Sequence, residues 1–243
     1  MEVFIDTANR QEIARWLEYG VVDGVTTNPA IMLKDGVSDI EAEVKEIAAL
    51  VGQRPVSVEV TTNDLEEMLI QAQTFAGWAS NIVIKIPVIN ADGAPCLGVI
   101  KTLERKGIAV NATVAMSFGQ VMLATKAGAT YASIFAGRVA DEGHDPAPLI
   151  RGAVEWIERW HYKTRVIVGS IRGVMDVQAA ALAGAHIITI PPQFLLKMMD
   201  HKYTRSTVHD FIEDAKKVMA QKGLVQVDKT LRVTGTRKPS KTR

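Results

Sequence analysis

The sequence predicts an α/β protein, a single-domain (β/α)8 TIM barrel that carries a C-terminal helix. Eight short apolar runs alternate with segments of helix length over about 220 residues, which is the size and rhythm of such a barrel. Several helical segments end on a glycine, which closes a helix in the left-handed conformation at low cost. The chain of 243 residues is 47% hydrophobic, so it can bury one large core. A doubly wound open sheet is the alternative.

The apolar runs are expected to form the strands. The first, 3–6, ends in an acid and is followed by a helical pattern at 10–19 that stops at Gly20. Residues 24–29 are interpreted as the second strand and its loop. The other strands are expected at 55–60, 82–85, 108–113, 131–135, 165–169 and 187–190.

Segments of helix length separate these runs. Glycines mark the helix ends before three of the later strands, at Gly107, Gly128 and Gly184. The strand and helix order therefore repeats along the chain. The remaining helices are expected at 40–50, 64–78, 96–105, 117–127, 146–160, 173–183 and 204–221.

Charge separates the body of the chain from its C-terminus. Residues 1–221 contain 21 basic and 26 acidic side chains, a net charge of −5, whereas 222–243 contain seven basic residues and one acid. We therefore expect a barrel domain at 1–221, including the C-terminal helix, and a basic, disordered tail at 222–243. An acidic body argues against a nucleic-acid groove, which needs a basic face. Neither a signal peptide nor a membrane span is indicated.

The sequence also argues against several cofactor classes. It contains no GxGxxG motif, no P-loop and no zinc-spaced cluster of histidine and cysteine, so neither a metal nor an organic cofactor is expected. His144 stands among acids at 142–145, a segment that could bind a metal but is more typical of a solvated turn. The one cysteine, Cys96, cannot form an internal disulfide, which fits a reducing compartment and predicts a cytoplasmic protein.

Lys85 is the residue on which the functional prediction depends. It stands in the run Asn81-Ile-Val-Ile-Lys-Ile-Pro87, which is otherwise typical of a buried strand. Burial disfavours the charged form of a lysine, so we expect a lowered pKa and a free amine near neutral pH. Such an amine can attack a carbonyl and form a Schiff base, an electron sink for cleavage of a carbon–carbon bond. A lysine at a strand end that reaches water is the alternative.

Other polar residues stand near the ends of the predicted strands, where the reactive groups of such barrels collect. Each alone has a structural explanation as a cap, an exposed strand residue or a surface charge. Together they suit a Schiff-base reaction, in which Asp6 and Glu59 move protons with the hydroxyl of Thr113. The guanidinium groups and hydroxyl at 138, 170 and 172 suit an anionic group, which predicts a phosphorylated sugar. The full set is Asp6, Thr26, Asn28, Glu59, Lys85, Asn111, Thr113, Ser133, Phe135, Arg138, Ser170 and Arg172.

The chain resembles the small transaldolases and the related fructose-6-phosphate aldolases over residues 2–219. These are class I enzymes that form a Schiff base on a (β/α)8 barrel. The motifs that carry the resemblance are highly specific together. They are Phe4-Ile-Asp-Thr-Ala8, Gly24-Val-Thr-Thr-Asn-Pro29, Val58-Glu-Val60, Val83-Ile-Lys-Ile-Pro87, Asn111-Ala-Thr113, Phe135-Ala-Gly-Arg138 and Gly169-Ser-Ile-Arg172.

The resemblance implies a role for each matching residue. Lys85 would form the Schiff base, and Asp6 would donate and accept the proton at the cleaved bond. Glu59 and Thr113 would hold the catalytic water. The residues that would bind the donor sugar are Thr26, Asn28, Asn111, Ser133 and Phe135, and those that would bind its phosphate are Arg138, Ser170 and Arg172.

Two positions indicate which branch of the family the chain resembles. The aldolases usually have Gln where this chain has Glu59, and Tyr where it has Phe135. The resemblance therefore implies a transaldolase of the pentose phosphate pathway, which moves a dihydroxyacetone unit from a ketose phosphate such as fructose 6-phosphate to an aldose acceptor. The nearest alternative is a fructose-6-phosphate aldolase that releases dihydroxyacetone. A noncatalytic barrel that binds sugar phosphates is the alternative from another class.

Some positions depart from the family pattern. Family members usually have an aromatic residue at Met116 and often at Ile171, and the loop 88–96 is longer than usual. A sulfonated ketose is therefore an alternative substrate, because arginine forks accept either anion. The resemblance also implies a homo-oligomer, a pentamer or a decamer, in which a C-terminal helix reaches a neighbour. An apolar stripe at 211, 212 and 218 fits that arrangement, although core packing would explain it equally well.

Overall fold

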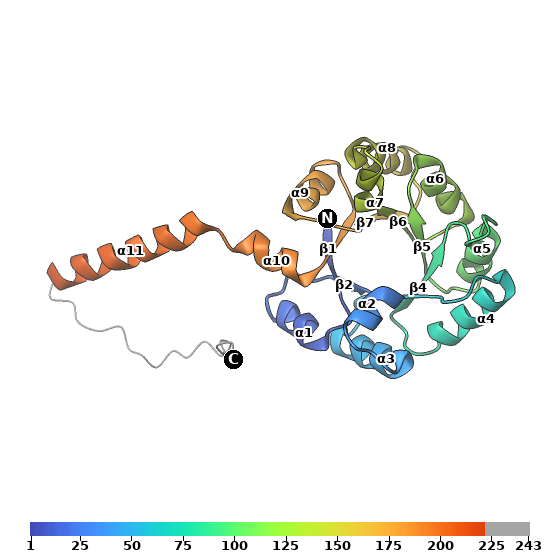
Figure 1. Ribbon diagram of the computed structural model, residues 1–243, viewed down its shortest axis with the longest axis horizontal. Coiled ribbons are helices and arrows are strands. Elements are labelled where there is room, and N and C mark those ends of the chain that lie inside the picture. The colour runs from blue at the N-terminus through green and yellow to red at the C-terminus, as the bar shows by residue number, and fades with distance from the viewer. Residues whose placement is uncertain (222–243) are drawn as a thin grey trace. The chain divides into compact units, whose positions relative to one another are not determined.

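The structure is a computed structural model that describes residues 1–221 (Figure 1). Residues 1–198 form one compact unit, and the described residues 199–221 belong to a second unit. The first unit holds the barrel, and the second contains helix α11 (Lys202–Gln221). The disordered tail expected at 222–243 lies outside the described residues. Within residues 1–221, no helix combines the length and the apolar character that crossing a bilayer requires.

Eight parallel strands form a closed barrel, which confirms the predicted fold class. The strands pair in chain order, and β1 closes the sheet because it pairs with β8 as well as with β2. Every predicted strand is present (Figure 1). The strands are β1 (Glu2–Asp6), β2 (Gly24–Thr26), β3 (Val56–Glu59), β4 (Ile82–Pro87), β5 (Val110–Ala115), β6 (Tyr131–Phe135), β7 (Arg165–Gly169) and β8 (Ile187–Ile190).

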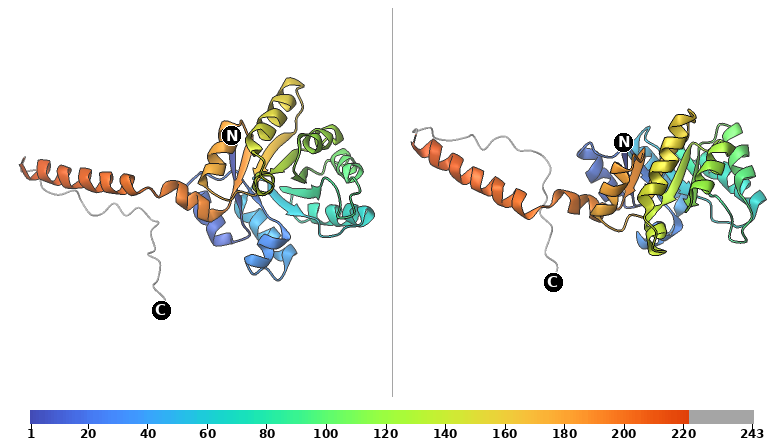
Figure 2. Two further views of the ribbon diagram at one scale, coloured as in Figure 1. Left: turned by 45° about the horizontal axis from the view of Figure 1, so that its top comes forward. Right: turned by 90° about the horizontal axis from the view of Figure 1, so that it is seen from above.

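Helices surround the barrel on its outer side in both views of Figure 2. Their inward faces cover the main apolar core, which lies between helices and sheet. The expected helices are all present, with ends that shift by one or two residues from the prediction. They are α1 (Arg10–Glu18), α3 (Ile40–Val51), α4 (Leu65–Ala76), α5 (Leu97–Arg105), α6 (Phe118–Ala127), α8 (Pro146–Arg159), α9 (Val174–Leu182) and α11.

Three further helices were not predicted: α2 (Pro29–Lys34), α7 (Ala136–Asp141) and α10 (Pro192–Met199). The first two contain six residues each, too few to show a helical period. The third begins at a proline, which fits the first turn of a helix because it needs no intrahelical N–H bond there. Both α2 and α7 directly follow strands, so they extend the loops that surround the mouth of the barrel.

Polar side chains determine where several helices begin. Asn9, Asp39, Asp64 and Ser117 each accept hydrogen bonds from backbone N–H groups in the first turn of the following helix. Asp145 does the same for α8, so the acidic segment next to it is a helix start. Within residues 1–221, no group of histidine, cysteine and acidic side chains is arranged to hold a metal ion.

Inside the barrel, an apolar layer supports a polar layer. Side chains two residues apart on a strand point to the same face. The apolar layer contains Phe4, Tyr131, Ile167 and Ile187. Two positions further along the same strands stand Asp6, Ser133, Gly169 and Thr189. The polar layer therefore lies toward the C-terminal ends of the strands, where the active sites of such barrels form.

Gly24 allows the apolar layer to close. A Cβ atom at this position would lie 2.7 Å from the ring of Phe4, with which Gly24 is paired in register. The missing side chain therefore gives the phenyl ring room inside the barrel.

Candidate active site

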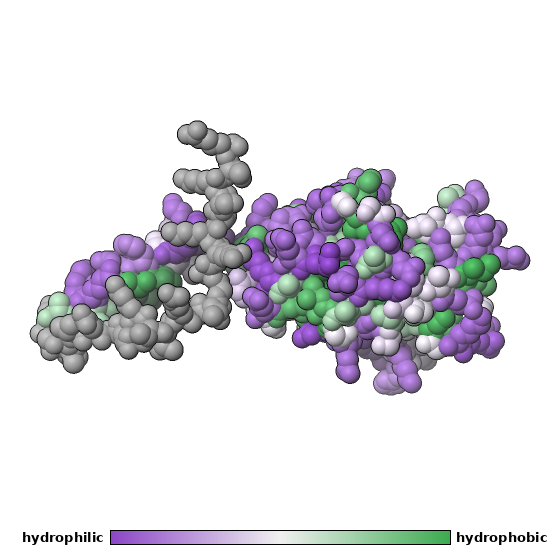
Figure 3. Space-filling view, turned by 90° about the horizontal axis from the view of Figure 1, so that it is seen from below, coloured by the Kyte–Doolittle hydropathy of each residue, from purple (hydrophilic) through white to green (hydrophobic). Residues whose placement is uncertain are grey.

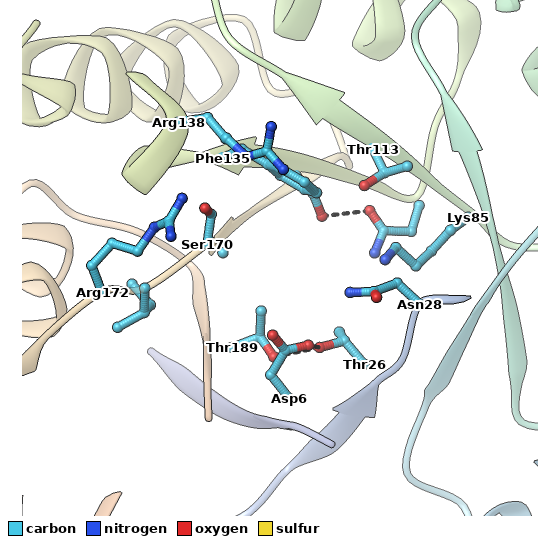
Figure 4. Close-up of a pocket in the computed structure, with 14 residues that line it drawn as sticks. Asp6, Thr26, Asn28, Lys85, Thr113, Phe135, Arg138, Ser170, Arg172 and Thr189 are labelled. Atoms are coloured by element: carbon cyan, nitrogen blue, oxygen red, sulfur yellow. Dashed lines mark hydrogen bonds between the residues drawn. The ribbon is translucent and has the colours of Figure 1, made fainter. Parts of the chain in front are cut away.

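A cavity of about 260 Å³ opens above the polar layer, and all but one of the predicted site residues form its wall (Figure 4). These side chains come from strands on all sides of the barrel. They are Asp6, Thr26, Asn28, Lys85, Asn111, Thr113, Ser133, Phe135, Arg138, Ser170 and Arg172. The exception is Glu59, whose carboxylate lies beside Lys85 without forming part of this wall.

Lys85 is buried, with 4% of the residue exposed, and its side chain lies in the barrel interior. Its Nζ atom donates a hydrogen bond to the backbone carbonyl of Thr27 at 2.9 Å. The same atom lies 2.9 Å from Oε2 of Glu59. This burial excludes the alternative of a lysine that reaches bulk water from a strand end.

The register of β3 and β4 places Glu59 beside Lys85, because the two residues are paired across the strands. A buried amine and carboxylate at this distance can exchange a proton directly. Removing either partner would leave the other charge buried without compensation, which typically costs about 3–5 kcal/mol. The pair therefore supplies both a nucleophile and the nearest group able to take its proton.

Asp6 faces the same cavity from β1. Burial raises the pKa of its carboxyl group above the usual value. A hydrogen bond of 2.6 Å from the hydroxyl of Thr26 and the nearby ammonium of Lys85 oppose that increase. Asp6 also borders a second cavity of about 260 Å³, together with residues that include Lys34 and Asp35. A carboxyl group in this setting can both take and return a proton.

Thr113 reaches the cavity from β5, because it lies two residues after Asn111 and points to the same face. The pairing of β5 with β6 then shifts by one residue between Ala112 and Ala115, and Val114 has a φ of 63° within this β-bulge. The hydroxyl of Thr113 is buried and has no hydrogen-bond partner among the described residues, so it is available to a substrate or a water molecule.

Two amide side chains and a hydroxyl form another part of the wall. The hydroxyl of Ser133 donates to Oδ1 of Asn111 at 2.6 Å, which fixes the orientation of that amide. Asn28 caps α2, because its Oδ1 accepts from the N–H of Ile31 at 2.9 Å. Its NH2 group is then the end of the side chain left for the cavity (Figure 4). These groups can hold several hydroxyls of one ligand.

Across the cavity from Lys85 lie Arg138, Ser170 and Arg172 (Figure 4). Arg138 comes from α7 and the other two from the loop after β7, where Ser170 has a φ of 59°. These two segments approach closely at Gly137, where a Cβ atom would lie only 2.0 Å from the carbonyl oxygen of Ser170. Two guanidinium groups and a hydroxyl suit a phosphate or sulfonate group.

A carboxylate neighbours this basic group. Nη2 of Arg172 lies 2.8 Å from Oδ2 of Asp141, and both side chains are more than half exposed. The carboxylate of Asp176 accepts from the backbone N–H of Arg172 at 2.8 Å. An exposed ion pair of this kind contributes at most about 1 kcal/mol of stability, so its main effect is to orient the guanidinium.

Comparisons with known proteins identify the family to which this pocket belongs. The family described as "Transaldolase/Fructose-6-phosphate aldolase" matches residues 3–235. Proteins from Dehalococcoides mccartyi and Lactiplantibacillus plantarum, both named "Probable transaldolase", are 42% identical to this chain over 90% of its length and 99% of theirs. The chain belongs to the transaldolase/fructose-6-phosphate aldolase family.

This family assignment confirms the resemblance seen in the sequence and indicates a transaldolase-type enzyme. A solved structure of thiamine phosphate pyrophosphorylase from Pyrococcus furiosus is also similar, with a TM-score of 0.52 over 78% of this chain and 85% of that one. Its sequence identity is 13%, so this likeness concerns the barrel fold alone.

Three residues of the transaldolase-family pocket were missed by sequence reasoning: Gly169, Ile171 and Thr189. Gly169 and Ile171 belong to a motif already quoted, and Ile171 was noted as a departure from the family pattern, but neither has a polar side chain that would mark it as a site residue. Thr189 is the one polar residue of β8, the strand for which no polar candidate was named. That polar position in an otherwise apolar run was a usable signal, because its side chain shares a face with that of Ile187.

Gly137 should be essential for anion binding. We expect Gly137→Ala to weaken binding of inorganic phosphate at least about tenfold, because overpacking at Ser170 costs about 1–3 kcal/mol and moves the groups that bind the anion. Isothermal titration calorimetry measures the affinity. Gly152→Ala is the matched control, because a Cβ atom there meets nothing within 4 Å. Unchanged phosphate affinity in Gly137→Ala would show that the two loops adjust without loss.

Proposed function

We propose that this protein is a transaldolase that transfers a dihydroxyacetone unit from a ketose phosphate, fructose 6-phosphate or a close analogue, to an aldose acceptor. The observation that carries the proposal is the position of Lys85 Nζ, which is buried, borders the cavity and lies 2.9 Å from the Glu59 carboxylate. The proposed reaction uses a Schiff base on this lysine and requires neither a metal nor an organic cofactor.

In the first step, the Lys85 amine attacks the ketone carbon of the donor. The amine must first lose a proton, and the Glu59 carboxylate is close enough to take it. The resulting carbinolamine loses water to give an iminium ion. The free hydroxyl of Thr113 and the Glu59 carboxylate are the groups that we assign to this water.

In the second step, the carboxylate of Asp6 takes the proton from the donor hydroxyl next to the bond that breaks. The electron pair of the carbon–carbon bond moves to the iminium nitrogen, which leaves an enamine on Lys85 and releases an aldehyde. Addition of the enamine to the acceptor aldehyde reverses these movements, and Asp6 returns its proton. Hydrolysis of the new iminium ion releases the product.

The remaining wall of the cavity binds the donor. We assign the sugar hydroxyls to Asn28, Asn111 and Ser133, with Thr26 near the reacting end and Phe135 as an apolar surface. The head group binds at the other end, to Arg138, Ser170 and Arg172. Binding energy from the head group would hold the ketone carbon near Lys85, which is how a remote group accelerates a reaction.

Lys85→Met should abolish the reaction, with a loss of about 10⁴-fold or more in turnover, because Lys85 is the one lysine among the described residues that line the cavity. In the unaltered protein, borohydride and fructose 6-phosphate should leave a reduced adduct on Lys85, detected by peptide mass spectrometry. Lys101→Met, an exposed position on α5, is the control. A protein that binds the donor but forms no adduct would be a noncatalytic sugar-phosphate-binding barrel. Repeating the adduct assay with sulfonated ketoses tests the head group.

Phe135 should favour transfer over release of dihydroxyacetone. Its ring borders the cavity and carries no hydroxyl with which to activate water. We expect Phe135→Tyr to raise cleavage of the donor in the absence of an acceptor by about twofold to tenfold, because a phenol hydroxyl can assist protonation of the enamine. The assay compares donor consumption with and without erythrose 4-phosphate, and Phe75→Tyr on α4 is the matched control. An unchanged ratio of cleavage to transfer would contradict this role.

We also propose that the protein is a homo-oligomer, a pentamer or a decamer, in which α11 contacts a neighbour. A cluster of apolar side chains is visible on part of this helix (green in Figure 3). Those that are exposed are Val208, Phe211, Ile212, Val218 and Met219. Their spacing places them on one stripe, which is typical of a helix that packs against another surface.

Phe211→Asp should reduce the size of the assembly in sedimentation velocity, because a charge in the stripe opposes its burial. Ser206→Asp adds the same charge on the other face of α11 and should leave the assembly intact. Sedimentation of the unaltered protein as a monomer would refute the oligomer.

A further inference from the structure

Three oxygen atoms form a short chain at the reacting end of the cavity (Figure 4). Oγ1 of Thr26 lies 2.6 Å from Oδ1 of Asp6 and 2.5 Å from Oγ1 of Thr189. Neighbouring strands supply all three, because β1 lies between β2 and β8 in the barrel. Thr26 and Thr189 are 3% and 6% exposed, so these hydrogen bonds are sheltered from bulk water.

The number of protons on these atoms limits how the chain can be arranged. A threonine hydroxyl has one proton to donate and two lone pairs that accept. Thr26 therefore cannot donate to Asp6 and to Thr189 at the same time. When Asp6 is ionised it can only accept, so Thr26 donates to Asp6 and Thr189 donates to Thr26.

The arrangement reverses once Asp6 holds a proton on Oδ1. The carboxyl group then donates to Thr26, Thr26 donates to Thr189, and the proton of Thr189 turns toward the cavity. Rotation of two hydroxyl groups is enough to satisfy both protonation states of Asp6. Without Thr189, the Thr26 hydroxyl would lose its hydrogen-bond donor in one state and its acceptor in the other.

We propose that Thr189 is a positioning residue for proton transfer, which aligns the Thr26 hydroxyl for Asp6 in both of its protonation states. The inference rests on the proposed transaldolase function. As the donor bond breaks, its hydroxyl proton moves to Asp6, the bonding electron pair moves to the iminium nitrogen, and the two hydroxyls reverse. When the enamine attacks the acceptor, the proton leaves Asp6 and the hydroxyls turn back, so the cycle takes up no net proton.

The pH dependence of turnover should report this role. Loss of the Thr189 hydroxyl weakens the hydrogen bond that Thr26 makes to the carboxylate, whereas a protonated carboxyl group can keep Thr26 as a donor by carrying its proton on Oδ2. The ionised state therefore loses more, and the pKa of Asp6 rises further. Since the cleavage step needs the carboxylate, the acidic limb of the kcat profile then moves to higher pH. The other charged groups around Asp6 are the same in the variants and in the unaltered protein. They are Lys85, Glu59, Lys34, Asp35 and Glu12.

The test compares Thr189→Val, which keeps the shape and removes the hydroxyl, with Thr189→Ser, which keeps the hydroxyl. We expect Thr189→Val to lower kcat about tenfold and to move the acidic limb upward by about half a pH unit, with KM changed by less than about twofold. Thr189→Ser should restore both values. Thr125→Val is the matched control, because that buried hydroxyl has no hydrogen-bond partner among the described residues.

The inference would be overturned if the pH profile of kcat for Thr189→Val equalled that of the unaltered protein. It would also be overturned if Thr189→Ser were as impaired as Thr189→Val, because the loss would then come from side-chain packing and not from the hydroxyl. Failure of the proposed function is recognised separately, because the unaltered protein would then form no borohydride-reducible adduct on Lys85.

Discussion

A lysine side chain held inside the barrel is the constraint on which the rest of the structure depends. Taking an ammonium and a carboxylate out of water costs several kcal/mol per ion, which only close contact and further hydrogen bonds offset. The register of β3 and β4 gives the contact between Lys85 and Glu59, and the Thr27 carbonyl gives a further hydrogen bond. The amine is thereby held at the wall of the cavity, where a substrate can reach it.

The alternation of side chains along each strand explains how one barrel holds both a stable core and a polar site. Outward-facing branched residues pack under the helices, while the inward faces begin with the apolar layer and continue with polar groups. Both kinds of residue occur on β1: Phe4 packs in the apolar layer, and Asp6, two residues later, borders the cavity. Polar residues near the C-terminal ends of the strands gather at the site, whereas Glu2 and Arg165, at the starts of β1 and β7, form an ion pair away from the cavity.

Because the strands are mostly apolar and contain few polar residues, much of the fold and of the site could be predicted from the sequence. The order of strands and helices follows from apolar runs and glycine ends, and a polar residue in such a run is conspicuous, as Lys85 is. The helices α2 and α7 escaped because six residues contain too little periodicity. The β-bulge at Val114 has no local sequence signature, since it depends on the pairing of β5 with β6.

Some features of the site depend on three-dimensional contacts alone. The position of Glu59 behind Lys85, away from the cavity wall, follows from side-chain directions that a strand prediction does not contain. Thr189 could have been named from its polar position in β8, but the contact of its hydroxyl with Thr26, a residue far away in the sequence, could not. The pairing of Arg172 with Asp141, 31 positions apart in the sequence, likewise joins the loop after β7 to the end of α7.

The division of the cavity between two sets of loops has a consequence for how such a protein can change over generations. The basic end is built from the segments after β6 and β7, whereas the residues proposed for the covalent reaction, Asp6, Glu59, Lys85 and Thr113, come from β1, β3, β4 and β5. Substitutions near Arg138 or Ser170 can therefore change which anionic head group the protein binds, while the residues of the proposed reaction stay the same. Related proteins can therefore acquire new substrates through substitutions in the loops after β6 and β7, while selection keeps the other side of the barrel unchanged.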